Sequence, residues 1–314
     1  MDLELGAHLP LISFDGASRS LGDLIAFTEA ARDLGYTHLC SNDHLVFARP
    51  WLDGPTALAA VASRSGEMTL ATTVIVPALR GPVATAKMIA TLDVLTEGRV
   101  LVAAGPGSSA RDYELIGIPF EERWRRLEES VQALRACWST EGAGFTGRYY
   151  STHAARLEPL PAQAGGPPIW IGSWGSAPGL RRVARHADGW LASGYNTTPE
   201  QFAAAWRDVL SQVAAAGREA EGFPNGIATM WSYVTDDAER AERVLADLLA
   251  PMLNRPVEQL RGRLPIGGPE ECAAVLSSYA AAGAQRVFLW PLMDERAQLQ
   301  AFRERVMPLV ADAA

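Results

Sequence analysis

The side chains best suited to acid–base chemistry stand directly after two short apolar runs of the sequence. His8 ends the first run, and Asp43 and His44 follow the run that ends at Cys40. An imidazole has an ordinary pKa of about 6.5, so near neutral pH it can both take up and release a proton. His44 is therefore the candidate for proton transfer. Asp43 is expected to hold the loop or a ring substituent, and a structural role is slightly favoured for His8.

Two turns rich in glycine and serine could bind an anion. They read GPGSS at 105–109 and GSWGS at 172–176, and each opens toward a predicted helix. Free backbone N–H groups at a helix N-terminus carry partial positive charge and suit a phosphate. The serines are equally suited to capping the helices, and the two roles are compatible. Tryptophans 51, 174, 231 and 290 lie near predicted strand ends, where they could wall a flat ring. A flat cofactor that carries phosphate is the expected ligand.

The elements that position these residues alternate between strand and helix. Strands are predicted at 3–9, 37–40, 68–76, 100–104, 169–171, 189–192, 227–234 and 286–290. Helices are predicted at 21–34, 55–64, 83–96, 123–138, 178–186, 200–216, 238–249, 270–282 and 302–310. Eight strands that are each followed by a helix indicate a parallel sheet with right-handed crossovers. We expect an α/β fold, a (β/α)8 TIM barrel, with a doubly wound open sheet as its main competitor.

In such a barrel, function lies at the carboxyl ends of the strands, and the candidates above lie at or near strand ends. The GPGSSA segment nearly satisfies a dinucleotide fingerprint, but it follows the fourth strand instead of the first, which argues against nicotinamide binding. Two stretches exceed ordinary loop length: 141–168, after strand four, and 251–268, after strand seven. Insertions of this kind usually cover the active face, so we expect them to determine the substrate. The prediction is a single domain over residues 1–314.

Composition excludes several classes of partner. A formal net charge of −8 argues against nucleic acid, because phosphate backbones require a basic face. No apolar run approaches the roughly 20 residues of a membrane span, and the N-terminus lacks the pattern of a signal peptide. Three widely separated cysteines, Cys40, Cys137 and Cys272, indicate free thiols, and no metal-ligand cluster is predicted. We therefore expect a cytoplasmic protein.

Five segments occur in an order that resembles the luciferase-like monooxygenase superfamily of flavin and deazaflavin barrels. They are SNDHL at 41–45, LATTVIVPALRGPVATAKMIATLDVLTEGRVLVAAGPG at 70–107, PFEERWRRLEESVQALRACW at 119–138, PPIWIGSWGSAPGLRRVARHADGW at 167–190 and IGGPEECAAVLSSYAAAGAQRVFLWP at 266–291. The resemblance runs from about Leu3 to Pro291 and independently supports the barrel.

The resemblance implies an oxidoreductase that uses FMN or coenzyme F-420, a deazaflavin hydride carrier. His44 would lie beside the reactive ring as the catalytic residue. The Thr73–Val74 peptide would be cis and would support the ring. The implied cofactor-binding residues are Asp43, Thr73, Val74, Gly105, Gly107, Ser108, Gly172, Ser173, Trp174, Gly175 and Ser176, with the 172–176 turn contacting phosphate.

Two departures from the family matter for the substrate. Its F-420 sugar-phosphate and alcohol dehydrogenases carry a tryptophan where this chain has Ala48, and a glutamate where it has Ser108. These differences put alcohol or sugar-phosphate dehydrogenation in doubt.

We predict an F-420-dependent oxidoreductase that moves hydride to or from a small organic substrate. One alternative is an FMN-dependent two-component monooxygenase, which would use oxygen, reduced flavin and a separate flavin reductase. The other is a flavin-binding protein without turnover. A homodimer is expected, because the family usually pairs through barrel helices and the helix at 83–96 is apolar nearly all round.

Overall fold

The computed structural model describes residues 3–14, 16, 19–142, 144–153 and 157–311. Its strands are β1 (Glu4–His8), β2 (His38–Ser41), β3 (Thr69–Ile75), β4 (Val100–Ala104), β5 (Ile169–Gly172), β6 (Gly189–Ser193), β7 (Asn225–Val234), β8 (Ile266–Gly267) and β9 (Arg286–Pro291). Its helices are α1 (Leu21–Asp33), α2 (Gly54–Val61), α3 (Pro77–Arg80), α4 (Pro82–Leu95), α5 (Ala110–Leu115), α6 (Arg123–Trp138), α7 (Ala177–His186), α8 (Pro199–Ala215), α9 (Ala238–Arg243), α10 (Ala250–Leu253), α11 (Pro269–Ala281), α12 (Glu295–Ala301) and α13 (Met307–Ala311). Short helical turns join them, including two π-helical segments, η3 (Val244–Leu249) and η5 (Phe302–Val306).

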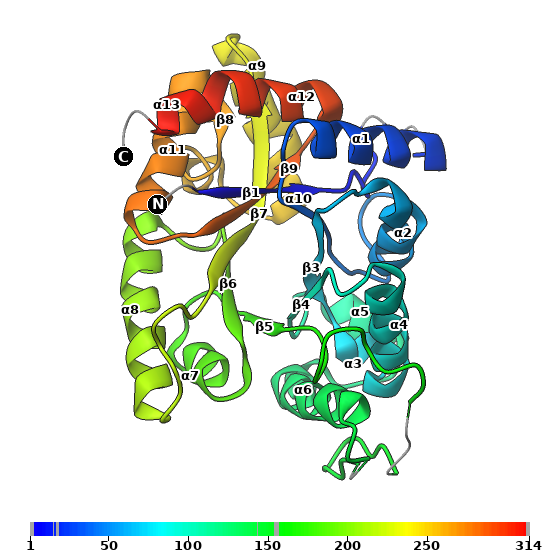
Figure 1. Ribbon diagram of the computed structural model, residues 1–314. Helices are drawn as coiled ribbons and strands as arrows, with labels where there is room; N and C mark the ends of the chain where they lie inside the picture. Colours follow the sequence, from blue (N-terminus) through cyan, green and yellow to red (C-terminus); the bar gives the residue numbers. More distant parts are fainter. Residues whose placement is uncertain (1–2, 15, 17–18, 143, 154–156, 312–314) are drawn as a thin grey trace.

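The strands close into a barrel. Parallel pairs run from β1 through β6 in sequence order, β6 pairs with β7, β7 with β9, and β9 returns to β1. Helices surround the ring of strands (Figure 1). The (β/α)8 barrel is therefore confirmed, and the open doubly wound sheet is excluded. All eight predicted strands are present, and the two-residue β8, which pairs with the end of β7, was not predicted.

The interior of the barrel is filled by side chains and is not a channel. Cys40, Ala71, Leu101, Ala103, Trp170, Leu191, Ala228 and Phe288 form one buried cluster. Gly6 on β1 leaves the room that the Phe288 ring needs, because a Cβ at residue 6 would lie 2.4 Å from Phe288 Cδ1. Layers of side chains of this kind are typical of closed (β/α)8 barrels.

The described residues of the first insertion, 141–142, 144–153 and 157–168, do not cover the active face, contrary to the expectation. The insertion packs along α6, where Glu129 accepts a hydrogen bond from Tyr149 N at 2.7 Å. It then reaches the amino end of β4, where Gln163 Nε2 donates to Val100 O at 2.9 Å. The expectation was wrong because this segment connects a helix to the next strand, and such connections return the chain to the amino ends of the strands.

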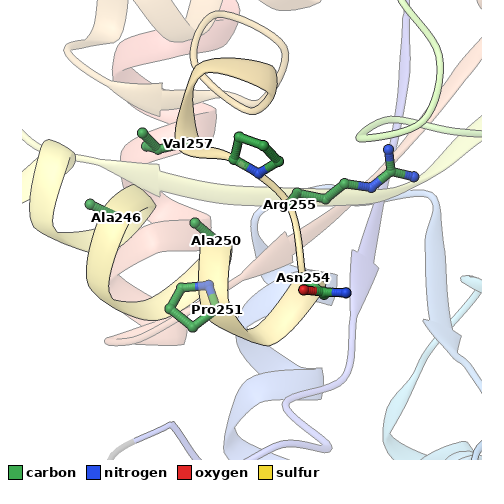
Figure 2. A pocket seen from close by; sticks show the side chains of 7 residues that line it. Ala246, Ala250, Pro251, Asn254, Arg255 and Val257 are labelled. Carbon is green, nitrogen blue, oxygen red and sulfur yellow. The ribbon is translucent and has the colours of Figure 1, made fainter.

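The second insertion, 251–268, lies at the carboxyl ends of the strands. Arg255 Nη2 donates to Asn196 Oδ1 at 2.7 Å, and Asn196 stands just beyond the end of β6. Figure 2 shows Arg255 directed away from Ala246 and Val257, which line a hollow of about 490 Å³ with it. This insertion therefore borders the barrel mouth, as expected.

Candidate active site

Asp43, after β2, is buried in an ion pair. Its carboxylate accepts hydrogen bonds from Arg80 Nε at 2.9 Å, Arg80 Nη2 at 2.5 Å and Val76 N at 3.2 Å. Arg80 also contacts Asp53, the N-cap of α2, and the two carboxylates raise the pKa of the guanidinium. These contacts hold the loop after β2 against β3 and α2. A contact between Asp43 and a cofactor stays a prediction.

His44, the next residue, is paired with Asp112 of α5. The distance from His44 Nδ1 to Asp112 Oδ2 is 2.8 Å, and the side chains are 15% and 4% exposed. The other oxygen, Asp112 Oδ1, accepts from Leu45 N at 3.1 Å and Val46 N at 2.9 Å. Burial alone would raise the pKa of Asp112, but the hydrogen bonds from His44, Val46 and Leu45 outweigh it and lower the pKa. Asp112 is therefore a carboxylate near neutral pH.

Aromatic rings enclose the histidine. The centroid of Trp51 lies 4.7 Å from that of His44, and the centroid of Phe47 lies 5.5 Å away. These apolar walls exclude water from part of the ring.

The ends of β3, β4 and β5 meet around one side chain. The Thr73–Val74 peptide is cis, which confirms the prediction. A Cβ at Gly105 would lie 2.6 Å from Val74 Cγ2, and one at Gly172 would lie 2.9 Å from Val74 Cγ1. The two glycines thus let Val74 bring both predicted cofactor turns together on the face that carries His44.

In the 105–109 turn, Gly107 has a φ of +70°, a conformation that favours glycine. Ser108 is exposed. Ser109 caps α5, because its Oγ accepts from Asp112 N at 3.2 Å. The turn is therefore joined directly to the helix that holds His44.

In the 172–176 turn, Gly175 has a φ of +92°, and Ser176 caps α7 by accepting from Gly179 N at 3.3 Å. The capping role expected for Ser176 is present. Ser173 is buried, and its Oγ accepts from Gly175 N at 3.4 Å. Trp174 is 56% exposed and lines a hollow of about 370 Å³ together with Asn196, which follows β6, and with residues of α7 and α8. The ten-residue α7 directs its N-terminus toward this turn, which suits a phosphate. The contact with a phosphate itself stays a prediction.

The other histidine at a strand end, His8, belongs to a buried aromatic stack. Trp290 lies between His8, at a centroid distance of 3.4 Å, and Trp231, at 3.9 Å. Burial lowers the pKa of His8 to about 3, and its Nδ1 donates to Leu9 O at 2.7 Å. His8 is therefore neutral, and the stack favours the structural role over one in a pocket.

Sequence reasoning missed Asp112 and Arg80. Asp112 stands three residues after Ser109, in the S-x-x-D pattern of a capped helix start, which indicates a capping role and not a partner for His44. In the folded barrel, α5 begins directly after the 105–109 turn and brings the buried Asp112 within hydrogen-bond reach of the loop after β2.

Comparison with known proteins identifies the family. The model of the luciferase-like monooxygenase family matches residues 12–286. The chain belongs to this family. It is 30% identical to an F420-dependent glucose-6-phosphate dehydrogenase of Kineococcus radiotolerans, over 92% of this chain and 93% of the relative.

Two solved structures of the same fold are similar over nearly the whole chain. An F420-dependent secondary alcohol dehydrogenase, in complex with an F420-acetone adduct, superposes with a TM-score of 0.85 at 17% identity, covering 99% of both chains. The monooxygenase RslO1 from Streptomyces bottropensis superposes with a TM-score of 0.80 at 20% identity, covering 98% of this chain and 99% of that one. At 17% and 20% identity, this structural similarity establishes that the chain shares the fold of these two proteins.

Proposed function

We propose that this protein is an F-420-dependent oxidoreductase that moves hydride between the cofactor and a small organic substrate. The observation that carries the proposal is the His44–Asp112 pair, which stands at the mouth beside the two turns that Val74 joins. The F420-dependent relative supports the choice of cofactor, because its similarity extends over 92% of the chain.

The residues at the mouth fit a flat, phosphate-bearing cofactor. Val74 and the glycines at 105 and 172 form a surface without charged side chains, which suits a ring. The capped N-terminus of α7 suits a phosphate. Thr73, Val74, Gly105, Gly107 and Ser108 would hold the ring, and Gly172, Ser173, Trp174, Gly175 and Ser176 the phosphate-bearing chain.

Bound F-420 supplies a carrier that accepts or donates one hydride, which is a proton with two electrons. Nε2 of His44 would accept the proton that a substrate loses when it is oxidised. In the reverse direction, His44 would return this proton to the substrate. Asp112 keeps the histidine ring in place throughout, and Trp51 and Phe47 limit the access of water.

A second candidate is an FMN-dependent monooxygenase with a separate flavin reductase. Ser108 favours it, because the exposed serine supplies no carboxylate at the 105–109 turn. A binding titration of the purified protein with F-420 and with FMN, in oxidised and reduced forms, distinguishes the two. We expect tighter binding of F-420. Binding of FMN alone, with oxygen-dependent product formation from reduced FMN, would establish the monooxygenase instead.

We also propose a cytoplasmic homodimer that pairs through α4. Val83, Val94 and Leu95 of this helix are exposed, and Leu95 is 73% exposed. In the part of the chain that the structure describes, no helix has the length and hydrophobicity to span a membrane.

A further inference from the structure

We propose that Asp112 is the positioning residue of the active site, and that it holds His44 with its proton on Nδ1 and its lone pair on Nε2. The kinetic consequence of this inference rests on the proposed function, whereas the assignment of the proton rests on the hydrogen bonds alone. It would add to the active site a residue on α5 that contacts neither substrate nor cofactor and acts through the histidine.

The contacts of one carboxylate fix both the ring and the backbone of the loop. Asp112 Oδ2 faces His44 Nδ1 at 2.8 Å, and Oδ1 accepts from the N–H groups of Leu45 and Val46. Rotation of the His44 ring would break the first contact. Movement of the loop after β2 would break the other two.

Chemistry then assigns the proton. A carboxylate only accepts hydrogen bonds, so the nitrogen that faces it carries the hydrogen. In a neutral imidazole the second nitrogen, Nε2, is then the acceptor. His44 is thereby prepared as a general base, and the imidazolium formed on proton uptake lies next to a negative charge that stabilises it.

Other titratable side chains on the surrounding elements are engaged elsewhere. Asp43 is paired with Arg80, and Arg111 contacts Glu114 at 2.6 Å. The hydroxyl of Tyr113 donates to Pro106 O at 2.6 Å. Asp112 is therefore the group that sets the protonation pattern of His44.

The same contacts couple the base to the proposed cofactor turn. Asp112 N donates to Ser109 Oγ at 3.2 Å, and Tyr113, the next residue, is bonded to Pro106 in the turn. A ligand that orders the 105–109 turn would also order the start of α5, and through Asp112 it would order His44.

The test compares Asp112→Asn with Glu114→Gln, which removes one carboxylate from an exposed position of the same helix. Side-chain 15N NMR of the full-length protein, with and without F-420, reports which ring nitrogen carries the proton. His44→Gln identifies the signals. We expect a proton on Nδ1 in the wild type and in Glu114→Gln, and a loss of this preference in Asp112→Asn.

Kinetics supply the second measurement. We expect Asp112→Asn to bind F-420 as the wild type does and to lose about 10²–10⁴ of kcat with little change in KM, the scale seen when a histidine base loses its orienting carboxylate. Asp112→Glu should restore part of the rate, and Glu114→Gln should leave it unchanged.

A wild-type proton on Nε2, or unchanged kinetics in Asp112→Asn, would overturn the inference. If F-420 does not bind while the NMR result stands, the proposed function fails and the positioning role of Asp112 remains. The two failures are therefore distinguishable.

Discussion

At the scale of single residues, His44 has one nitrogen available for chemistry, because Asp112 engages the other at 2.8 Å. We expect His44→Ala to keep cofactor binding while turnover slows by about 100-fold or more, the usual effect of losing a general acid–base group. Titration with F-420 and steady-state rates on the same preparation measure both properties. Turnover at the wild-type rate with cofactor bound would reduce His44 to a packing residue.

The buried His8 should make folding stability depend on pH. Its pKa falls from 6.5 to about 3 on folding, because burial disfavours the charged ring. Below pH 6.5 the unfolded chain therefore binds a proton that the folded chain does not, and the free energy of unfolding decreases as the pH falls toward 3. The contribution from His8 reaches about 2 kcal/mol at pH 5.

Urea unfolding of the wild type and of His8→Gln, at pH 7 and pH 5, measures this effect. The difference in unfolding free energy between the two pH values should be smaller in the variant. His38 is also buried, and its pKa is lowered to about 4, so part of the dependence should remain. An identical pH dependence in both proteins would contradict the prediction.

How far the sequence predicts the site depends on where the partners of each residue lie. His44, the cis peptide and both turns are local patterns, so the order of the motifs was sufficient to find them. The partner of His44 lies 68 residues away and that of Asp43 lies 37 residues away. Such pairs depend on how strands and helices meet in the closed barrel, which periodicity does not specify.

At the scale of elements, the two insertions differ in the end of the barrel that they reach. Their lengths can be read from the sequence, but the end of the barrel that each one reaches depends on the two elements that it connects. The first follows α6 and therefore leads to the amino end of β5. The second lies between β7 and α11, the helix that returns the chain to β9, so it stays at the carboxyl ends of the strands, where a substrate would enter.

The Arg255–Asn196 hydrogen bond joins the second insertion to the end of β6. Asn196 Nδ2 in turn donates to Ser193 Oγ at 3.0 Å, so the contact continues into the barrel. A hydrogen bond from a charged group contributes about 1.5–3 kcal/mol, less where solvent reaches it. We expect Arg255→Leu to release this insertion locally while the barrel stays folded.

Hydrogen exchange measured by mass spectrometry checks this expectation. Amides of 250–263 should exchange about tenfold faster in Arg255→Leu, which corresponds to roughly 1.4 kcal/mol of lost local stability. Arg261→Leu is the control, because Arg261 lies in the same insertion but is exposed and pairs with Glu242 of α9. If the amides of 250–263 exchange at the same rate in both variants, the stability of this insertion comes from its apolar contacts and not from the Arg255–Asn196 hydrogen bond.

At the scale of the whole molecule, closure of the sheet decides which residues meet. β2 and β6 stand four strands apart in the ring of eight, so the loops that follow them lie on opposite sides of the mouth. His44 follows β2, and Asn196 with its partner Arg255 follows β6. A ligand between them would contact the proposed base on one side and the second insertion on the other.

On the outer surface of the barrel, α4 carries an apolar face that we expect to pair with a second copy of the chain. Exposed valine and leucine side chains of α4 are costly in water, and their burial against a second copy would remove apolar surface at about 25 cal/mol per Å². Stable interfaces bury about 1,200–2,000 Å² in total, so α4 would supply the centre and its neighbours the rim. We expect light scattering of the purified protein to give the mass of a dimer.

Leu95→Glu should convert this dimer to a monomer, because two glutamates would be brought into an apolar interface without partners. Leu309→Glu on α13 is the matched control, since it makes the same change at an exposed leucine on another helix. It should remain dimeric. If both variants stay dimeric, the subunits pair through a different face of the barrel. If the wild type is a monomer at working concentration, the exposed face of α4 has another role.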